Sequence, residues 1–254
     1  MLFILKAILF IYVAVGVLLY VFQRNLLYFP AAKMEYDFKR MSLKDGNETL
    51  NTIVLNEGKE NAIVYFGGNG ESVVYNAESF SKTFPNFTLY LVDYRGYGWS
   101  SGEPTEANLF NDALLVYDEV KAKHKEVNVM GRSLGSGVAS YLSSKRAVHK
   151  LVLITPFDSI KNVAQKMYAI YPMGLMLKEQ YNSVEYLKSK KTKNILILMA
   201  EKDTLVPNEH SLALAKSLPQ DEVEVKVIQN VGHNSISNVQ SYYEILGKFM
   251  NVEQ

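Results

Sequence analysis

Ser100 and Ser133 each lie in the pattern Gly-x-Ser-x-Gly, which can hold a nucleophilic serine on a sharp turn between a strand and a helix. Ser133 follows the apolar run 127–130 and precedes a segment with good helix formers, as such a turn requires. Ser100 is followed closely by Pro104, which prevents a helix from leaving the turn. The glycines on either side of Ser133 leave space for a strained backbone. Ser133 is therefore the predicted nucleophile.

A serine hydroxyl is a poor nucleophile until a base accepts its proton, so this chemistry requires a histidine. The chain contains His124, His149, His210 and His233. The first three lie in charged or helical surroundings, which indicates surface positions. His233 directly follows the last strand-like run, 222–228, in a loop at the end of that strand. It is the predicted base.

The base needs an acid that holds its tautomer and stabilises the imidazolium. Asp203 follows the apolar run 194–199 and lies between the serine and the histidine in the chain. Glu201 and Asp158 are alternatives in similar places, although Asp158 could instead cap the helix that follows it. The position of Asp203 after a strand favours it as the acid.

The oxyanion that forms during attack on a carbonyl needs preorganised donors, commonly two backbone N–H groups. The residue after the nucleophile, Leu134, supplies one. The glycine-rich loop 67–72 follows the run 62–66, and Asn69 within it is the predicted second donor. A phosphate-binding loop would continue into Gly-Lys-Ser/Thr, which is absent here.

The composition of the 254 residues is that of an ordinary globular protein, with 48% hydrophobic and 21% charged residues. A net charge of +1 gives no reason to expect a nucleic-acid partner. Because the chain contains no cysteine, it has no disulfide scaffold, cysteine nucleophile or cysteine-ligated metal. The histidines are too scattered for a zinc site, and we expect neither a metal nor an organic cofactor.

Short apolar runs alternate with helix-length segments from about residue 35 onward. Strands are predicted at 36–43, 50–56, 62–66, 88–93, 127–130, 150–154, 194–199 and 222–228, and helices at 107–125 and 237–250. Runs rich in Val, Ile and Leu and separated by helices are typical of a mostly parallel sheet that is buried on both faces. The pattern predicts a single α/β domain over residues 25–254.

Residues 158–191 interrupt this alternation with the apolar stretch MYAIYPMGLML, which Pro172 and Gly174 break. One interpretation is a small helical cap over the carboxyl edge of the sheet, where open α/β sheets bind their substrates. The other is a long, kinked crossover helix. The segment is long for a simple crossover, which favours the cap.

Residues 2–22 are apolar apart from Lys6. At ~1.5 Å per residue, a helix over this stretch is ~30 Å long, about the thickness of a bilayer's hydrocarbon core. It predicts a transmembrane anchor over residues 1–24. A cleaved signal peptide would have a shorter core and a nearby small-residue site, and a buried core helix would keep a polar face. Most positive charge follows the span, which by the positive-inside rule keeps the domain in the cytoplasm, whereas a signal-anchor would deliver it across the membrane; the sequence leaves this choice open.

The candidate residues occur in the order Ser133, Asp203, His233, which differs from the orders in chymotrypsin and subtilisin and matches that of α/β-hydrolases. The chain also contains FQRNLLYFP, DYRGYGWSSGEPTE, GRSLGSGVA, TPFDSI, AEKDTLVP and VGHN. With these motifs it resembles the α/β-hydrolase superfamily over residues 35–250. More narrowly, it resembles the membrane-anchored, bud-emergence-type alpha/beta hydrolase domain-containing proteins.

The resemblance implies an α/β-hydrolase fold: a mostly parallel eight-stranded sheet flanked by helices, with a small helical cap and an N-terminal transmembrane helix. It implies a Ser133–His233–Asp203 triad with Asn69 and Leu134 as oxyanion donors, and a structural role for Ser100. Many relatives have histidine where this chain has Gly67, so the support of the oxyanion loop departs from the family pattern.

The expected function is that of a membrane-anchored serine hydrolase that cleaves acyl esters or thioesters through an acyl-enzyme. Its expected partners are the membrane and a small-molecule, lipid or acylated-protein substrate. One alternative is a serine peptidase of the prolyl-oligopeptidase type, although no acidic cluster for a peptide amino terminus is evident. The other is a non-catalytic, membrane-tethered interaction module, against which the intact set of candidate residues argues.

Overall fold

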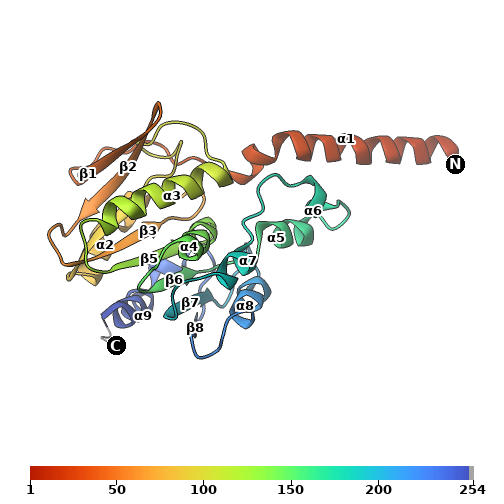
Figure 1. The fold of residues 1–254 in the computed structure, drawn as a ribbon. Helices are drawn as coiled ribbons and strands as arrows, with labels where there is room; N and C mark the ends of the chain where they lie inside the picture. The colour runs from red at the N-terminus through yellow and green to blue at the C-terminus, as the bar shows by residue number, and fades with distance from the viewer. Residues whose placement is uncertain (252–254) are drawn as a thin grey trace.

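Eight strands form one sheet in the order β1-β2-β4-β3-β5-β6-β7-β8 (Figure 1). The strands are β1 (Lys39–Asp45), β2 (Glu48–Leu55), β3 (Asn61–Phe66), β4 (Phe87–Val92), β5 (Val127–Arg132), β6 (Leu151–Ile154), β7 (Ile195–Ala200) and β8 (Val223–Ile228). This computed structural model describes residues 1–251. Strand β2 runs antiparallel to its neighbours β1 and β4, and β3 to β8 are parallel. The predicted mostly parallel, eight-stranded sheet is confirmed.

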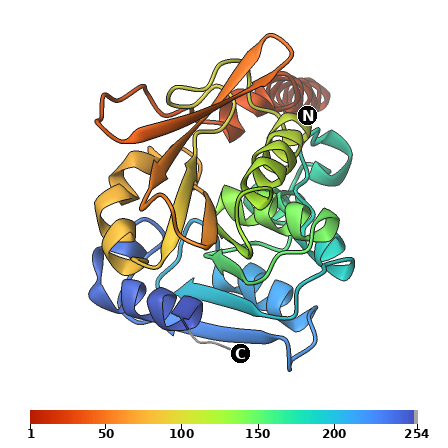
Figure 2. The ribbon, with the colours of Figure 1, turned by 60° about the vertical axis from the view of Figure 1, so that its left-hand side comes forward.

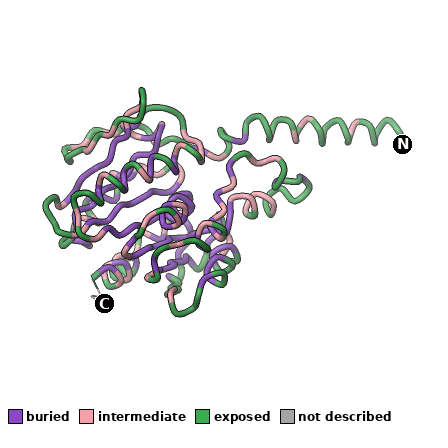
Figure 3. The backbone as a smooth tube through the Cα atoms, in the orientation of Figure 1, coloured by how far each residue is buried: buried purple, intermediate pink, exposed green. Residues whose placement is uncertain are grey.

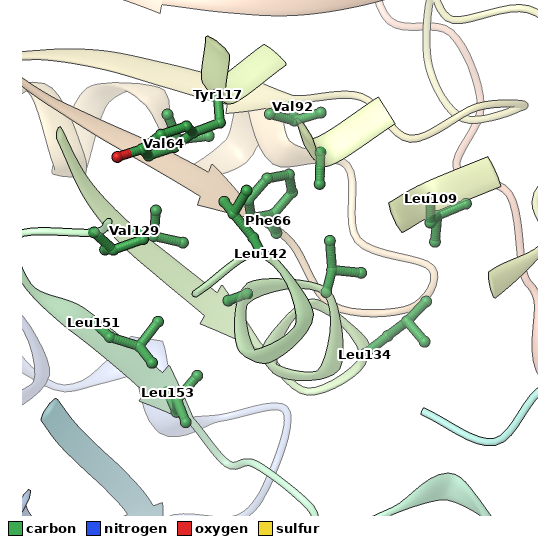
Figure 4. Packing of buried hydrophobic residues seen from close by; sticks show 14 of the residues in the cluster. Val64, Phe66, Val92, Leu109, Tyr117, Val129, Leu134, Leu142, Leu151 and Leu153 are labelled. Carbon is green, nitrogen blue, oxygen red and sulfur yellow. The ribbon is translucent and has the colours of Figure 1, made fainter. Parts of the chain in front are cut away.

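Helices cover both faces of the sheet, as Figure 2 shows. The two apolar clusters assign α2 (Ala77–Thr83) and α9 (Gln240–Asn251) to one face, and α3 (Glu106–Lys121), α4 (Leu134–Lys145), α7 (Ser183–Lys188) and α8 (Asn208–Lys216) to the other. Two short 3₁₀ helices, η1 (Val73–Asn76) and η2 (Ile236–Asn238), lie in loops. In Figure 4, Val64, Val129 and Leu151 of three adjacent strands lie in one packed cluster with Leu142 of α4. Burial on two faces explains why these strands are continuous apolar runs.

The segment 158–191, which we call the cap segment, connects the carboxyl end of β6 to β7. It contains α5 (Ile160–Met167), α6 (Met173–Met176) and α7, and not one long crossover helix. The side chain of Ser159 caps α5, and Pro172 precedes α6. Helices α5 and α6 lie on the side of the domain from which α1 projects (Figure 1).

Helix α1 (Leu2–Leu27) projects from the domain and is almost entirely exposed (Figure 3). It is long and apolar enough to cross a membrane, criteria that a signal sequence also meets. Its carboxyl end is tied to the domain. The Arg24 Nε lies 2.7 Å from a carboxylate oxygen of Glu179. The buried Tyr28 hydroxyl lies 2.7 Å from that of Tyr181.

The loop after β4 contains the buried carboxyl group of Asp93. Burial raises the pKa of Asp93 to about 6, although the Trp99 N–H and the charge of Arg40 act in the opposite direction. The Trp99 N–H donates to this carboxyl group at 3.1 Å. A Cβ at Gly98, where φ is +50°, would lie 2.5 Å from the same group. This close approach explains the glycine in the DYRGYG motif.

The raised pKa predicts that stability depends on pH through Asp93. Between pH ~4 and ~6 the folded protein keeps this proton while the unfolded chain has lost it, so the free energy of unfolding falls as the pH rises, by at most about 3 kcal/mol. Asp93→Asn retains an acceptor for the Trp99 N–H but does not titrate. We expect chemical denaturation in detergent to show a flatter pH dependence for this variant in that window. Equal slopes of the free energy of unfolding against pH in the two proteins would contradict a raised pKa of Asp93.

Candidate active site

Ser133 lies on the turn between β5 and α4, at the carboxyl edge of the sheet. Its backbone is strained, with φ 49° and ψ −115°, a combination rarely found outside glycine. Neighbouring glycines make the turn possible, because a Cβ at Gly131 would lie 2.2 Å from the Gly135 carbonyl oxygen. A Cβ at Gly135 would lie 2.1 Å from the Phe66 carbonyl oxygen. The strand–turn–helix geometry is that of a nucleophile elbow.

The structure brings the predicted serine, histidine and aspartate together. The Ser133 Oγ lies 2.9 Å from His233 Nε2, and His233 Nδ1 lies 2.7 Å from Asp203 Oδ2. With the histidine proton on Nδ1, that nitrogen donates to the carboxylate and Nε2 accepts from the serine hydroxyl. The three residues come from the loops after β5, β7 and β8, which end at the same edge of the sheet.

The acid is held in place by its second carboxylate oxygen. Asp203 Oδ1 accepts hydrogen bonds from the N–H groups of Leu205 at 3.0 Å and Val206 at 2.8 Å. The Asp203 side chain is almost fully buried. These backbone donors orient Oδ2 toward His233. Glu201 instead accepts from the Asn230 N–H at 2.8 Å.

The surface position predicted for His210 is wrong. His210 is only 6% exposed, and its Nδ1 lies 2.9 Å from an Asp158 oxygen. Asp158 also accepts from Asn162 and from the backbone N–H of Ser159, the residue that caps α5. This second histidine–aspartate pair lacks a serine partner at the free nitrogen, since His210 Nε2 has no hydrogen bond among the described residues. The sequence alone did not indicate that His210 of α8 packs against Asp158 in the loop after β6.

Two backbone segments that could supply oxyanion donors lie near the nucleophile. Leu134 begins α4, where the first N–H groups have no partner within the helix. The glycine-rich loop passes directly beside Ser133, because a Cβ at Gly68 would lie 3.7 Å from the Ser133 Cβ. The next residue, Asn69, uses its side chain elsewhere. Its Oδ1 accepts from the Phe29 N–H, and its Nδ2 donates to the Leu27 carbonyl.

Sequence reasoning missed the residue that braces this loop. Glu71 accepts from the Gly68 N–H at 2.7 Å and from the Tyr65 hydroxyl and the Asn76 amide. Its carboxylate also pairs with Arg132 at 3.4 Å, and Arg132 donates to the His233 carbonyl at 3.1 Å. Glu71 thus braces the loop in this chain, in which position 67 is a glycine. An acidic residue in the glycine-rich loop and an arginine in the elbow were the available signal.

The hydrogen bonds of Glu71 to the glycine-rich loop predict that Glu71→Gln slows the chemical step. The amide nitrogen would remove the acceptor of at least one donor to Glu71, and Arg132 would lose its counter-charge, so the loop N–H groups would shift. We expect kcat for an activated ester to fall about 10- to 100-fold with KM nearly unchanged. Asn76→Ala is the matched control because it removes a donor to Glu71 without touching Gly68. Equal kcat values for the two variants would argue against this role.

Ser100, the serine of the other Gly-x-Ser-x-Gly pattern, is 5% exposed. Its hydroxyl accepts from the Asn51 N–H at 2.8 Å and donates to the Asp93 carbonyl at 2.7 Å. It therefore joins the loop after β4 to β2. Within residues 1–251, no group of three or more His, Cys, Asp or Glu side chains is arranged to hold a metal ion.

Comparisons with known proteins agree with the fold described above. A family model described as alpha/beta hydrolase fold matches residues 61–176. An uncharacterized protein of Mycobacterium tuberculosis is 28% identical over 243 residues, covering 87% of this chain and 85% of its own length. Alpha/beta hydrolase domain-containing protein 17C of Xenopus tropicalis is 27% identical over 176 residues, 66% of this chain and 54% of that protein.

Among solved structures, the Pyrococcus furiosus esterase Pf2001 superposes with a TM-score of 0.67 at 19% identity, covering 87% of this chain and 95% of the esterase. At this identity the likeness shows a shared fold. Together with the sequence relatives and the sheet described above, these matches support a hydrolase. The chain has the α/β-hydrolase fold, and the matches to the family model and to the curated relatives support the α/β-hydrolase superfamily.

Proposed function

We propose that this protein is a membrane-anchored serine hydrolase that cleaves esters or thioesters of acyl, lipid-like substrates. The observation that carries the proposal is the unbroken hydrogen-bonded chain from Ser133 through His233 to Asp203. An activated serine of this kind is what acyl transfer to water requires. The interaction-module alternative gives no reason for a strained serine within hydrogen-bond reach of a buried histidine.

In the proposed reaction, Ser133 Oγ attacks the carbonyl carbon while His233 Nε2 takes the hydroxyl proton. The N–H groups of Leu134 and Asn69 stabilise the oxyanion. His233 then protonates the departing alcohol or thiol, which leaves an acyl group on Ser133. A water molecule, deprotonated by His233, attacks this ester; the bond to Ser133 Oγ then breaks, the acid leaves, and His233 returns the proton to the serine oxygen. Asp203 stabilises the imidazolium in both halves of the reaction.

An apolar groove supports the acyl character of the substrate. It has a volume of about 170 Å³ and lies between the end of α1 and the cap segment. Its lining includes Leu19, Leu26, Val163, Ala164, Met167 and Met173. A hydrocarbon chain matches this lining, whereas a peptide backbone would leave polar groups unpaired there. We assign the groove to the acyl chain of the substrate.

Helix α1 supports the proposed location at a membrane. Its apolar side chains are exposed over most of its length, and it is long enough to cross a bilayer. Exposure of this much apolar surface to water would be unfavourable, which a lipid environment resolves. An enzyme held at the bilayer in this way would meet acyl substrates at high local concentration.

The test is a substrate panel offered to the full-length protein in detergent: nitrophenyl esters of increasing acyl length, and peptide nitroanilides. We expect ester hydrolysis and no amide hydrolysis. Ala164→Phe fills the groove and should raise KM for a long-chain ester about tenfold while leaving an acetyl ester nearly unaffected. Leu212→Phe, on the exposed face of α8, is the matched control. Hydrolysis of peptides alone would favour the peptidase. The absence of both turnover and labelling by a serine-reactive probe would favour the interaction module.

A further inference from the structure

An uncharged segment of the cap, residues 167–177, carries exposed apolar side chains. Its sequence, MYAIYPMGLML, lies between Lys166 and Lys178. The side chains of Ile170 and Leu175 are 72% and 88% exposed. A soluble domain gains nothing from placing such a segment on its surface, because each exposed apolar side chain forgoes the free energy of burial.

This segment lies along α1. The rings of Tyr12 and Tyr171 stack with centroids 4.7 Å apart. The Tyr12 hydroxyl donates to the Ile170 carbonyl at 2.8 Å, and the Tyr171 hydroxyl donates to the Tyr12 carbonyl at 3.1 Å. Nearer the domain, Gln23 Nε2 donates to the Met176 carbonyl at 3.2 Å. The contacts therefore extend from the end of α1 to the middle of its apolar stretch.

The position of Tyr12 sets the depth of the segment. Tyr12 is the central residue of the apolar stretch 2–22, so it lies ~15 Å from either end of that stretch at ~1.5 Å per residue. If the segment stayed in water, the residues of α1 before Tyr12 would provide only ~15 Å of helix for a hydrocarbon core of ~30 Å. For α1 to span the bilayer, its partner segment must enter the bilayer with it.

We propose that residues 167–177 insert into the lipid leaflet on the domain side, beside α1, as a second membrane-embedded element. The inference rests on the membrane anchoring in the proposed function, and it adds the part of the domain that meets the lipid. The embedded face presents Ile170 and Leu175 to acyl chains. The groove between this segment and α1 then lies at the level of the leaflet.

Several polar groups of the segment are paired with one another, as a hydrocarbon environment favours, since an unpaired backbone group is costly there. The N–H groups of Tyr171 and Leu177 donate to carbonyls within the segment, and that of Tyr168 donates to α5. The Gln165 amide donates to the Tyr171 carbonyl at 2.9 Å and accepts from the Met173 N–H at 3.0 Å.

Charged residues flank the segment at both ends, as expected at the boundary with the headgroups. The Lys178 ammonium lies 4.7 Å from the ring centre of Tyr20 on α1. The Lys166 ammonium pairs with Glu209 of α8. Both lysines can extend toward lipid phosphates while the apolar residues between them remain in the leaflet.

The absence of cysteine from the chain permits a direct test with single-cysteine variants. Leu175→Cys, labelled with an environment-sensitive fluorophore, reports on the cap. Val13→Cys reports on α1, and Val227→Cys, on the exposed face of the edge strand β8, is the control on the domain. Each full-length protein is reconstituted into phosphatidylcholine vesicles that carry spin labels on the acyl chains or on the headgroups.

We expect the fluorophore at position 175 to shift to the blue and to lose most of its emission to acyl-chain spin labels, as at position 13, while position 227 stays unquenched. Quenching at position 13 without quenching at 175 would overturn the proposal and leave the anchor intact. Quenching at neither position would overturn both. All three side chains are exposed in the structure, so the substitutions leave packing undisturbed.

Discussion

Ser133→Ala should lower kcat for an activated ester by at least about 10⁴-fold and abolish labelling by a fluorophosphonate. The alanine removes the only oxygen within hydrogen-bond reach of His233 Nε2 among the described side chains, where the serine hydroxyl lies at 2.9 Å. The remaining oxyanion donors and the binding groove leave a small residual activity. Single-turnover kinetics and probe labelling of the membrane fraction measure the loss.

Ser100→Ala is the matched control, because Ser100 lies in the same five-residue pattern. Its hydroxyl bonds to main-chain groups of Asn51 and Asp93, so its removal should reduce stability by about 1 kcal/mol and leave labelling intact. Labelling that persists in Ser133→Ala and disappears in Ser100→Ala would identify Ser100 as the nucleophile. That result would overturn the assignment of the elbow.

Asp203→Asn should lower kcat about 10⁴-fold with little change in KM. An amide at this position can donate to His233 Nδ1, which favours the tautomer whose proton is on Nε2. That tautomer cannot accept the Ser133 proton. The fold should persist, since the oxygen of the amide can still accept from the N–H groups of Leu205 and Val206. The measurement is kcat against pH for an ester.

The second histidine–aspartate pair provides the control for this substitution. Asp158→Asn changes the partner of His210, which lies apart from the Ser133–His233 chain in its hydrogen bonding. We expect kcat within a few-fold of the wild type and a loss of stability of about 1–3 kcal/mol, as for a buried polar contact. A larger loss of kcat in Asp158→Asn than in Asp203→Asn would assign the acid to Asp158.

The central strands could be predicted closely because they are buried on both faces. The run 194–199 is observed as β7 (Ile195–Ala200), and the run 150–154 as β6 (Leu151–Ile154), within one residue at each end. The predicted cap segment was less definite, since Pro172 and Gly174 break its pattern without stating where the helices lie. Its three short helices depend on contacts with α1 and with the domain, which local preferences do not encode.

The site residues likewise fall into those that local patterns predicted and those that they did not. A serine on a strand–turn–helix is a local feature, and the placement of Asp203 and His233 after strands follows from the rule that parallel strands end at one edge. The bracing role of Glu71 and the burial of His210 were not predicted. Each depends on a partner far along the chain, Arg132 for the first and Asp158 for the second. A single sequence does not report such pairings.

The fold class, the apolar character of α1 and the candidate nucleophile could all be inferred from local patterns, because periodicity, turn chemistry and hydropathy act over a few residues. The folded structure was needed to show that Glu71 supports the glycine-rich loop, that His210 is internal and that residues 167–177 lie against Tyr12 of α1. Such contacts are chosen by the packing of whole elements. Their free energy is realised only when distant segments meet, so no local pattern records them.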